Sequence, residues 1–448
     1  MRLAYKLDNA ACSDLRALMN RPFRAATILA VIAPCLCGAC GSSVPALQTD
    51  GGDGGQAEEA GIIDAGIESG EAGLPRNMPQ ISSLAVLLAD AGSPVVLPSP
   101  KIVPIFFAKD DPSTTAQLTA FLSEVVSSSY WAGVVSEYGV GAATIHAPVQ
   151  LTAADDPGSM VDDSQIKAWL TQKLDSNDPS LPPADKNTVY VFFYPAGTTV
   201  TFAGSTSDGH HTYTNQNVPV PYAVVPRVSG VSASGFVGTI SLSGPDFLTF
   251  ATSHELVEAV ADPLGTGYFG WDAEHEYWFD FLGAELADAC EFSSPAKLGN
   301  GTVARIWSNK AAALGSDPCV PALPGDVYFN SAAVLDDSVS FALPFPSIPP
   351  VSTKGVHIPV GQSATVELDL FSSAPTTGPW SVSAVDLASL EKAPAQLQFT
   401  FDKTSGQAGD KLHVTIHVLS AGQGNAELFE VVSTLGSQTH YWFGIVGN

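Results

Sequence analysis

His254, Glu255 and Glu258 form an HExxE pattern, the arrangement in this sequence that most directly suggests chemistry. Residues 244–263 (GPDFLTFATSHELVEAVADP) have the pattern of one helix, with a proline near its start and a second proline that stops it after residue 261. On a helix, His254 and Glu258 lie one turn apart on the same face, with roughly 6 Å between their Cβ atoms. This spacing suits two ligands of one cation.

In a metalloprotease helix, two side chains at this spacing hold Zn²⁺, and the glutamate between them takes a proton from the bound water. Here His254 and Glu258 would be the ligands and Glu255 the general base. A carboxylate oxygen is a harder ligand than an imidazole nitrogen, so the pattern admits Ca²⁺ or Mn²⁺ as well as Zn²⁺. The alternative is a solvated helix face with an ordinary i,i+4 His–Glu pair.

A second acidic segment, residues 285–290 (ELADAC), could complete such a site. We predict a third ligand from Glu285 or Asp288, with Asp262 or Asp272 in reserve. The helix is otherwise apolar, so polar side chains embedded in it need partners. A hydrogen-bond network without a metal would meet the same need.

Several short motifs follow one another between residues 209 and 290. They are, in chain order, GHH (209–211), PYAV (221–224), SHELVE (253–258), DP (262–263), GW (270–271) and ELADAC (285–290). This order resembles the phosphate-induced, Exordium-like family of secreted proteins, and also bacterial secreted proteins noted as zincin-like hydrolases. The similarity covers roughly residues 100–320. It implies a zincin-like layered domain in which glutamate at position 258 is the family's own residue type, and the plant members imply a wall-associated role without an established reaction.

Other chemistry-bearing patterns are weaker. Adjacent side chains on a strand face opposite ways, so at most one of His210 and His211 could join the site. The segment 230–235 (GVSASG) lacks the second glycine of a nucleophile elbow at the required place. His413 and His417 would share a strand face that is most simply a solvated one.

The N-terminus predicts the compartment. Residues 25–39 are a short apolar stretch behind two arginines, typical of a signal peptide over residues 1–39, with Met19 as an alternative start. The stretch ends in LCGAC, which resembles a bacterial lipobox with Cys40 as the lipidated residue. Cleavage with free secretion is the alternative. We expect a protein of the bacterial cell envelope, lipid-anchored at the outer membrane or cell surface, or secreted.

The cysteines agree with an oxidising compartment. Of the 6 cysteines, three leave with the signal peptide and Cys40 would carry lipid. The remaining two, Cys290 and Cys319, are therefore expected to form a disulfide. A metal site with two thiolates would need further soft ligands close by.

The charge is strongly negative. The 448 residues include 19 Lys and Arg against 45 Asp and Glu, a net charge of −26. Residues 1–39 contain five of the cations and two of the anions, so the mature charge is −29. Such a surface repels phosphate backbones, and no nucleic-acid partner is expected. No apolar run after residue 40 approaches the roughly 18 residues that span a bilayer.

Residues 40–81 are rich in Gly, Ala, Asp and Glu, which predicts a disordered tether. Residues 82–322 alternate strand and helix patterns, which indicates an α/β or α+β layered domain. Its expected strands are 101–107, 188–194 and 222–225, and its expected helices are one from Ser113 to near Gly139 and one that carries Ile166, Trp169 and Leu170.

The composition changes near residue 325. A proline-rich linker is predicted over 323–349, followed by an all-β, Ig-like sandwich over 350–448. Its expected strands are 364–370, 380–385, 397–401, 412–418, 428–432 and 441–446.

Two functions of different class fit these residues. The first is a metal-dependent, peptidase-like hydrolase. The second is a non-catalytic cell-surface or wall-associated protein, in which the cluster holds a structural metal or only a polar network and the sandwich binds a polypeptide or cell-wall polymer. They differ in whether one coordination position stays open. Neither a substrate nor an oligomeric state follows from the sequence.

Overall fold

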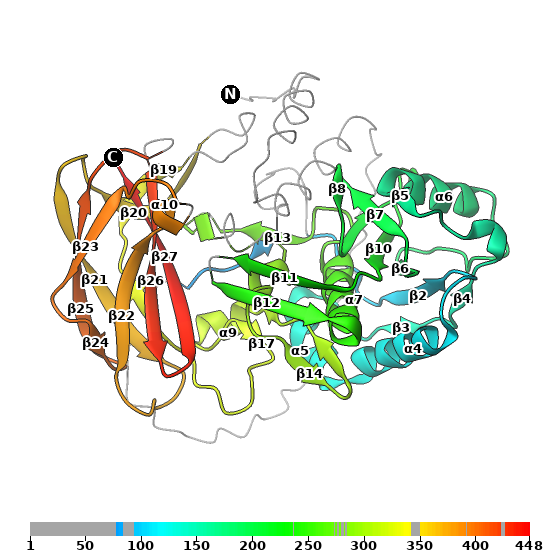
Figure 1. Cartoon of the computed structure of the whole chain (residues 1–448), viewed down its shortest axis with the longest axis horizontal. Coiled ribbons are helices and arrows are strands. Elements are labelled where there is room, and N and C mark those ends of the chain that lie inside the picture. Colours follow the sequence, from blue (N-terminus) through cyan, green and yellow to red (C-terminus); the bar gives the residue numbers. More distant parts are fainter. Residues whose placement is uncertain are drawn as a thin grey trace, which may run out of the picture.

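The structure is a computed structural model that describes residues 78–83, 94–235, 237–272, 274–275, 277–278, 282, 285–341, 350–390, 392–422 and 426–448. The predicted signal peptide, the lipidation site Cys40 and the tether up to residue 77 lie outside the described residues. Two parts lie side by side in Figure 1, a layered α/β part and a β-sandwich. In the parts of the chain described here, no helix has the length and apolar character needed to cross a membrane.

A mixed sheet forms the centre of the α/β part. Its strand order is β3-β2-β6-β10-β9, with β4 also paired to β2. Every pair is parallel except that of β9 with β10 at one edge. The strands are β2 (Lys101–Phe106), β3 (Thr144–Ile145), β4 (Val149–Gln150), β6 (Thr188–Tyr194), β9 (His210–Tyr213) and β10 (Pro221–Pro226). The strands expected at 101–107, 188–194 and 222–225 are thereby confirmed.

Alternate side chains of these strands enter two separate cores. Along β6, Val189 and Val191 pack on the side of α4 (Pro112–Ser127), α5 (Ser129–Val135) and α7 (Gly244–Ala261). The intervening Tyr190 and Phe192 pack on the side of α6 (Asp163–Asp175). Every residue of β6 is buried, as expected of a parallel strand with helices on both faces. The result is three layers, helix on sheet on helices (Figure 1).

The helix expected from Ser113 to near Gly139 is interrupted. It divides at Ser128, whose backbone is extended (φ −86°, ψ 163°) and whose hydroxyl donates to Val125 O. The serine hydroxyl supplies a hydrogen bond to a carbonyl at the end of the first helix, and a second helix starts after it. The last turn, η1 (Ser136–Tyr138), ends at Gly139 with a left-handed φ of 81°.

Helix α7 carries the HExxE pattern and is buried along most of its length. It begins and ends as predicted, and the N–H of Asp262 donates to Glu258 O at its end. Its second side is covered by later chain, including β15 (Gly301–Val303) and η3 (Asp288–Cys290), and the N–H of Ala304 donates to Ser253 Oγ at 2.9 Å. Polar side chains on this helix are therefore held away from bulk water and must find partners inside the fold.

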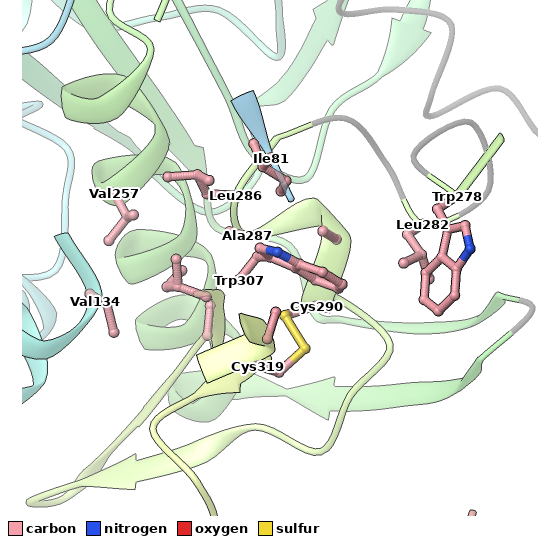
Figure 2. Close-up of a cluster of buried hydrophobic side chains, with 14 of the residues drawn as sticks. Ile81, Val134, Val257, Trp278, Leu282, Leu286, Ala287, Cys290, Trp307 and Cys319 are labelled. Carbon is pink, nitrogen blue, oxygen red and sulfur yellow. A yellow bond between two sulfur atoms is a disulfide. The ribbon is translucent and has the colours of Figure 1, made fainter. Parts of the chain in front are cut away.

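A disulfide joins Cys290 to Cys319, as the cysteine count predicted. It connects η3 to β17 (Cys319–Val320), which pairs with β16 (Ile306–Trp307). Figure 2 shows the bridge beside Trp307, in the same buried cluster as Leu286, Ala287 and Val257 of α7. The bridge therefore fixes the acidic segment 285–290 in a buried position.

Shorter strands complete this part. They are β1 (Ser82–Ser83) with β13 (Tyr268–Trp271), β5 (Met160–Asp162) with β7 (Thr199–Phe202) and β8 (Ser205–Thr206), β11 (Gly230–Gly235) with β12 (Gly238–Ser243), and β14 (Ala296–Leu298) with β15. The end of the predicted tether belongs to the fold, because Met78 and Ile81 are buried and the backbone of Ile81 pairs with the Asn309 side chain at 2.6–2.7 Å.

The C-terminal part is an Ig-like sandwich of two facing sheets (Figure 1). A 4-stranded sheet has the order β18-β21-β25-β23, and a 6-stranded sheet has the order β19-β20-β27-β26-β22-β24. The strands are β18 (Phe329–Ala333), β19 (Asp337–Phe341), β20 (Val351–His357), β21 (Ser363–Ser372), β22 (Trp380–Asp386), β23 (Leu397–Phe401), β24 (Ser405–Gly406), β25 (Lys411–Val418), β26 (Ala426–Leu435) and β27 (Gln438–Gly447). All six expected strands are present.

Two of these strands come from the stretch predicted as a linker. β18 pairs with β21 along five residues, and β19 pairs with β20 along five more. Residues 329–333 (FNSAA) are buried on both faces, so they lack the alternation that marks a half-exposed strand. The sandwich therefore begins before residue 330.

The two parts are joined by aromatic packing. The Trp278 ring lies 5.1 Å from the rings of both Trp442 and Phe443 of β27, edge to face. The carbonyl of Glu274 accepts hydrogen bonds from Lys354 N at 2.9 Å and from Thr353 Oγ1 at 2.8 Å. Buried apolar residues of both parts consequently form one continuous cluster.

Candidate metal centre

Three segments that are far apart in the sequence meet at the second half of α7. They are α7 itself, strand β9 at the sheet edge and the disulfide-bound segment 285–291, and His211 of β9 lies 3.4 Å from Glu285 of that segment. The side chains that they bring together are His211, His254, Glu255, Glu258, Glu285 and Asp288. All five residues proposed from the sequence lie in this group, and His211 joins them.

One set, which we call the His254 triad, consists of His254, Glu258 and Asp288. His254 Nε2 lies 3.2 Å from Glu258 Oε2 and 3.2 Å from Asp288 Oδ1. Ligand atoms bound tetrahedrally at about 2.0 Å from Zn²⁺ are about 3.3 Å apart. The i,i+4 pair from the helix and the acid from η3 therefore already have the separation that a small divalent cation requires.

A second set, the His211 triad, consists of His211, Glu258 and Glu285. His211 Nε2 lies 3.4 Å from Glu285 Oε1, and its Nδ1 lies 3.8 Å from Glu258 Oε2. Since β9 alternates, the neighbouring His210 points to the other side, where its Nε2 lies 3.1 Å from Asp163 Oδ1. His211 alone of the pair belongs to the centre, which agrees with the expectation that at most one of two adjacent strand residues could do so.

Glu258 belongs to both triads and is fixed by the backbone. Its Oε1 accepts hydrogen bonds from the N–H groups of Ala287 and Asp288, both at 3.1 Å. Its Oε2 is the oxygen that faces His254 and His211. Two donors on one oxygen orient the carboxylate and leave the other oxygen directed at the imidazoles.

Glu255 lies at the edge of the group. Its Oε2 is 3.8 Å from His211 Nδ1, and a Cβ atom at position 209 would lie 2.5 Å from its Oε1. Only glycine lets the chain before β9 pass so close to this carboxylate. The glycine of the GHH motif thus makes room for the glutamate of the HExxE motif.

The centre is deeply buried and rich in acid. The side chains of His254 and Glu255 are 9% exposed and that of Glu258 is 2% exposed, while Asp288 at 28% is the most open. Asp262, a reserve ligand in the sequence prediction, is also buried, and no hydrogen bond to its Oδ2 is present in the described part of the chain. Carboxyl groups clearly outnumber imidazoles here.

Burial and repulsion between the carboxylates raise the pKa values of three acids in the centre. Burial, together with Glu258, Asp288 and other nearby carboxylates, raises the pKa of Glu285 well above its usual range. Burial also raises the pKa of Glu255 and that of Asp288, although the imidazoles oppose both shifts.

The carboxylates of the centre also influence the pKa values of two neighbouring acids, Glu291 and Asp262. Burial, aided by Asp288, raises the pKa of Glu291 to about 8, and burial raises the pKa of Asp262. Acids with raised pKa values take up protons unless a cation supplies the positive charge.

The pKa values of the imidazoles are raised as well, but by the neighbouring carboxylates and against the effect of burial. Burial lowers the pKa of His254, but Glu258 and Asp288 outweigh it, so the pKa of His254 is raised well above its usual range. The pKa of His211 is likewise raised, because its pairing with Glu255 and Glu258 outweighs burial. The pKa of Glu258 is lowered, since His254, His211 and the backbone N–H of Asp288 outweigh its burial. Glu258 is thus the acid of the cluster best kept ionised.

Other residues considered from the sequence lie elsewhere. Asp272 accepts from Gln80 N at 2.9 Å and lies 2.9 Å from His275 Nδ1, so it ties β13 to the N-terminal segment. His413 and His417 are on the solvent-facing side of β25, beside Asp402 and Ser363 respectively. No sequence signal had indicated Glu291, whose proximity to Asp288 follows from the turn after η3.

Comparison with known proteins adds little. No family model matches this chain, and no curated protein does. Among solved structures, domains 4 and 5 of the S-layer protein SbsC are 16% identical with a TM-score of 0.16, over 29% of this chain and 81% of that one. The titin M3 domain is 10% identical with a TM-score of 0.14, over 21% of this chain and 85% of that one. A titin Z1Z2 chimera is 18% identical with a TM-score of 0.15, and the match covers 21% of this chain and 42% of the chimera. Likenesses of this size carry no argument about function.

Proposed function

We propose that this chain is a secreted or surface-located protein of the bacterial envelope, held at the membrane by lipid on Cys40, whose α/β part holds a divalent cation in a closed, structural site. The observation that carries the proposal is the His254 triad, with two N···O distances of 3.2 Å among side chains that are mostly buried. A structural metal site is closed by protein ligands, whereas a catalytic one keeps a position open for water or substrate. Only Asp288 is substantially exposed here.

The electrostatics support a resident cation. Glu255, Glu258, Glu285 and Asp288 face two imidazoles inside the protein, and placing unpaired carboxylates there is costly. Two imidazoles with raised pKa values offset part of that charge. Zn²⁺ fits the mixed nitrogen and oxygen ligands at these separations, and Mn²⁺ or Ca²⁺ fits the oxygen-rich remainder.

The arrangement of the α/β part agrees with a zincin-like layered domain. The HExxE helix packs on one face of a mixed sheet whose edge strand, β9, runs antiparallel and begins beside that helix. The Ig-like sandwich would serve as the binding part, with a polypeptide or a cell-wall polymer as its partner. The disulfide fits an oxidising compartment outside the cytoplasm.

Metal analysis of the full chain after the predicted signal peptide tests this proposal. We expect at least one equivalent of a divalent metal after purification without chelator, and a lower melting temperature once a chelator has removed it, because the cation clamps α7 to the 285–291 segment. Less than about a tenth of an equivalent, with an unchanged melting temperature in chelator, would rule out the cation.

A second candidate, a metal-dependent hydrolase of peptides, is favoured by one observation. Glu255 lies at the edge of the centre, 3.8 Å from His211 Nδ1, where a general base could act, and Asp288 is the partly exposed side chain of the triad. In that function His254, Glu258 and Asp288 would hold the metal, which would lower the pKa of a bound water, and Glu255 would take the proton. Glu255→Gln should then abolish hydrolysis of a casein-type substrate while metal content stays the same. Equal and negligible hydrolysis by both proteins would leave the structural function standing alone.

A further inference from the structure

The two triads at α7 share one residue and otherwise use different ligands. His254 and Asp288 belong to one, and His211 and Glu285 belong to the other. They come from different segments, since η3 supplies Asp288 and β9 supplies His211. A single cation could draw on a mixture of these side chains, but the two imidazoles approach Glu258 Oε2 separately, at 3.2 Å and 3.8 Å.

The carboxylate of Glu258 is divided between two tasks. Its Oε1 is occupied by two backbone N–H groups, each at 3.1 Å, and cannot also serve as a strong metal ligand. Its Oε2 alone faces both imidazoles. If both triads bind metal, Oε2 must contact both ions, which is the role of a bridging oxygen.

The number of buried carboxylates in the centre also favours two cations. One divalent cation would neutralise two carboxylates, yet Glu255, Glu258, Glu285 and Asp288 all lie within the cluster, and Asp262 lies beside it. The buried Asp262 Oδ2 has no hydrogen-bond partner among the described residues, although the other oxygen accepts from Gly267 N at 2.6 Å. Buried carboxylates in this number are best compensated by a second cation.

We propose that the centre binds two divalent cations, one in each triad, bridged by Glu258 Oε2. The inference rests on the proposed function, because it takes the His254 triad as the first cation site. Zn²⁺, a borderline cation, and Mn²⁺, a harder one, both accept one imidazole together with carboxylate oxygens and are the ions we expect here. In known two-metal sites such ions lie about 3.5–4 Å apart. Glu255, 3.8 Å from His211 Nδ1, and the buried Asp262, which acts on His211 electrostatically, offer further oxygens on the His211 side.

Manganese provides a direct test. The full chain after the predicted signal peptide is stripped of metal, titrated with Mn²⁺ and followed by metal analysis and by electron paramagnetic resonance. We expect two Mn²⁺ per chain and the spectrum of an exchange-coupled pair, which needs no variant and so does not depend on whether a variant folds. A spectrum of isolated ions at saturation would overturn the inference.

Variants separate the two positions. His211→Ala and Glu285→Gln should each reduce the stoichiometry from two to one, and so should His254→Ala, with loss of the coupled signal in all three. His413→Ala, which removes an exposed histidine on β25, is the matched control and should keep both ions. Near-ultraviolet circular dichroism of each variant checks that it folds.

The outcomes distinguish the two proposals. One ion in the wild type that is lost in His254→Ala but kept in His211→Ala would overturn the second position and leave the proposed function intact. One ion lost in either variant would mean a single shared site and would also overturn it. No bound ion in the wild type would overturn both proposals together.

Discussion

Glu258 has the most constrained side chain of the centre, because hydrogen bonds hold one of its oxygens while imidazoles face the other. His254 depends on it directly, at 3.2 Å along the same helix face. Glu255 is the neighbour of His254 on the helix, and its carboxylate contacts His211. Adjacent residues on α7 therefore have separable roles, which substitutions can distinguish.

Substitution of His254 separates a metal site from a polar network. If His254 is a ligand, chelator should lower the melting temperature of the wild type by more than that of His254→Ala, because the variant has already lost the cation of the His254 triad. Glu255→Gln should keep the chelator response of the wild type, since it preserves size and removes no His254-triad ligand. In a polar network without metal, His254→Ala would cost about 1–3 kcal/mol and chelator would change nothing. Differential scanning calorimetry with and without chelator measures both, and an equal response of wild type and His254→Ala would contradict the ligand role.

Gly209 is required by the close approach of Glu255. In Gly209→Ala, the added Cβ would lie 2.5 Å from Glu255 Oε1, so the carboxylate or β9 must move. We expect a loss of about 1–3 kcal/mol in unfolding free energy and weaker metal binding. Gly133→Ala is the control, since nothing lies within 4 Å of its added Cβ on the exposed side of α5, and it should stabilise by about 0.5–1 kcal/mol. Urea unfolding of both variants provides the comparison, and equal stability of the two would show that the carboxylate moves freely.

At the scale of elements, η3 and α7 form a unit held by two different links. The N–H groups of Ala287 and Asp288 bind the Glu258 carboxylate, and Cys290 anchors the same turn to β17. The acid Asp288 is two residues from the bridged cysteine. Covalent and polar links thus fix one ligand against another across different segments.

The Cys290–Cys319 bridge should stabilise both the fold and the metal site. It closes a loop with a sequence separation of 29, worth on the order of 3 kcal/mol in the chain-entropy account. The double variant Cys290→Ala/Cys319→Ala should lose about that much stability and bind metal more weakly, because Asp288 is less restrained. Chemical denaturation and metal titration measure the two effects. Unchanged metal affinity in a destabilised variant would show that η3 is held by its hydrogen bonds alone.

Strand β26 carries a buried acid that should make stability depend on pH. Burial raises the pKa of Glu430 to about 7, and no hydrogen bond to its Oε2 is present within the described chain. Its ordinary value in the unfolded chain is 4.5, so between these values the folded state holds more protons than the unfolded state. Unfolding free energy should therefore fall as the pH rises from about 4.5 to 7.

Glu430→Gln should remove that part of the pH dependence. It should match the wild type near pH 4, where Glu430 is protonated, and exceed its stability at pH 8. The exposed Glu124→Gln on α4 serves as the control and should leave the profile unchanged. Thermal melts across this range provide the measurement, and a wild type that gains stability relative to Glu430→Gln with rising pH would reverse the assigned sign.

At the scale of the whole molecule, the two parts share a core instead of being joined by a free linker. Trp278 packs edge to face on Trp442 and Phe443, and Tyr277 donates to Phe443 O at 3.5 Å. Because β18 and β19 lie before residue 350, a sandwich cut at 350 loses one strand from each sheet. The sandwich is a complete pair of sheets only when residues from about 327 onward are included.

Fragments test this arrangement. Residues 324–448 should unfold cooperatively, whereas residues 350–448 should not, because β21 and β20 would each lose a neighbour and expose a sheet edge. Trp278→Ala in the full chain should lower stability by about 3–5 kcal/mol if its indole is as well packed as its 4% exposure indicates. Cooperative unfolding of the 350–448 fragment would contradict the assignment of β18 and β19 to the core of the sandwich.

The sequence by itself determined the features that depend on local pattern. The bounds of α7 followed from its prolines, the buried strands β2, β6 and β10 from their apolar runs, and three of the six expected sandwich strands, β21, β23 and β25, from strict alternation. The bridge followed from counting cysteines. The helix and the strands depend on residues that are neighbours in the chain, and the bridge had only two cysteines to join. Features of this kind can therefore be predicted from the sequence.

The tertiary structure alone decided which side chains meet. The register of β9 against β10 turns His211, and not His210, toward α7. The path between α7 and η3 pairs Asp288 with His254 and Glu285 with His211, where the sequence left both acids open. Strands β18 and β19 fall in the stretch that the sequence assigned to a linker, and only their pairing with β21 and β20 places them in the sandwich. Contacts of this kind depend on strand register and on packing between distant segments, and periodicity along the chain carries no information about either.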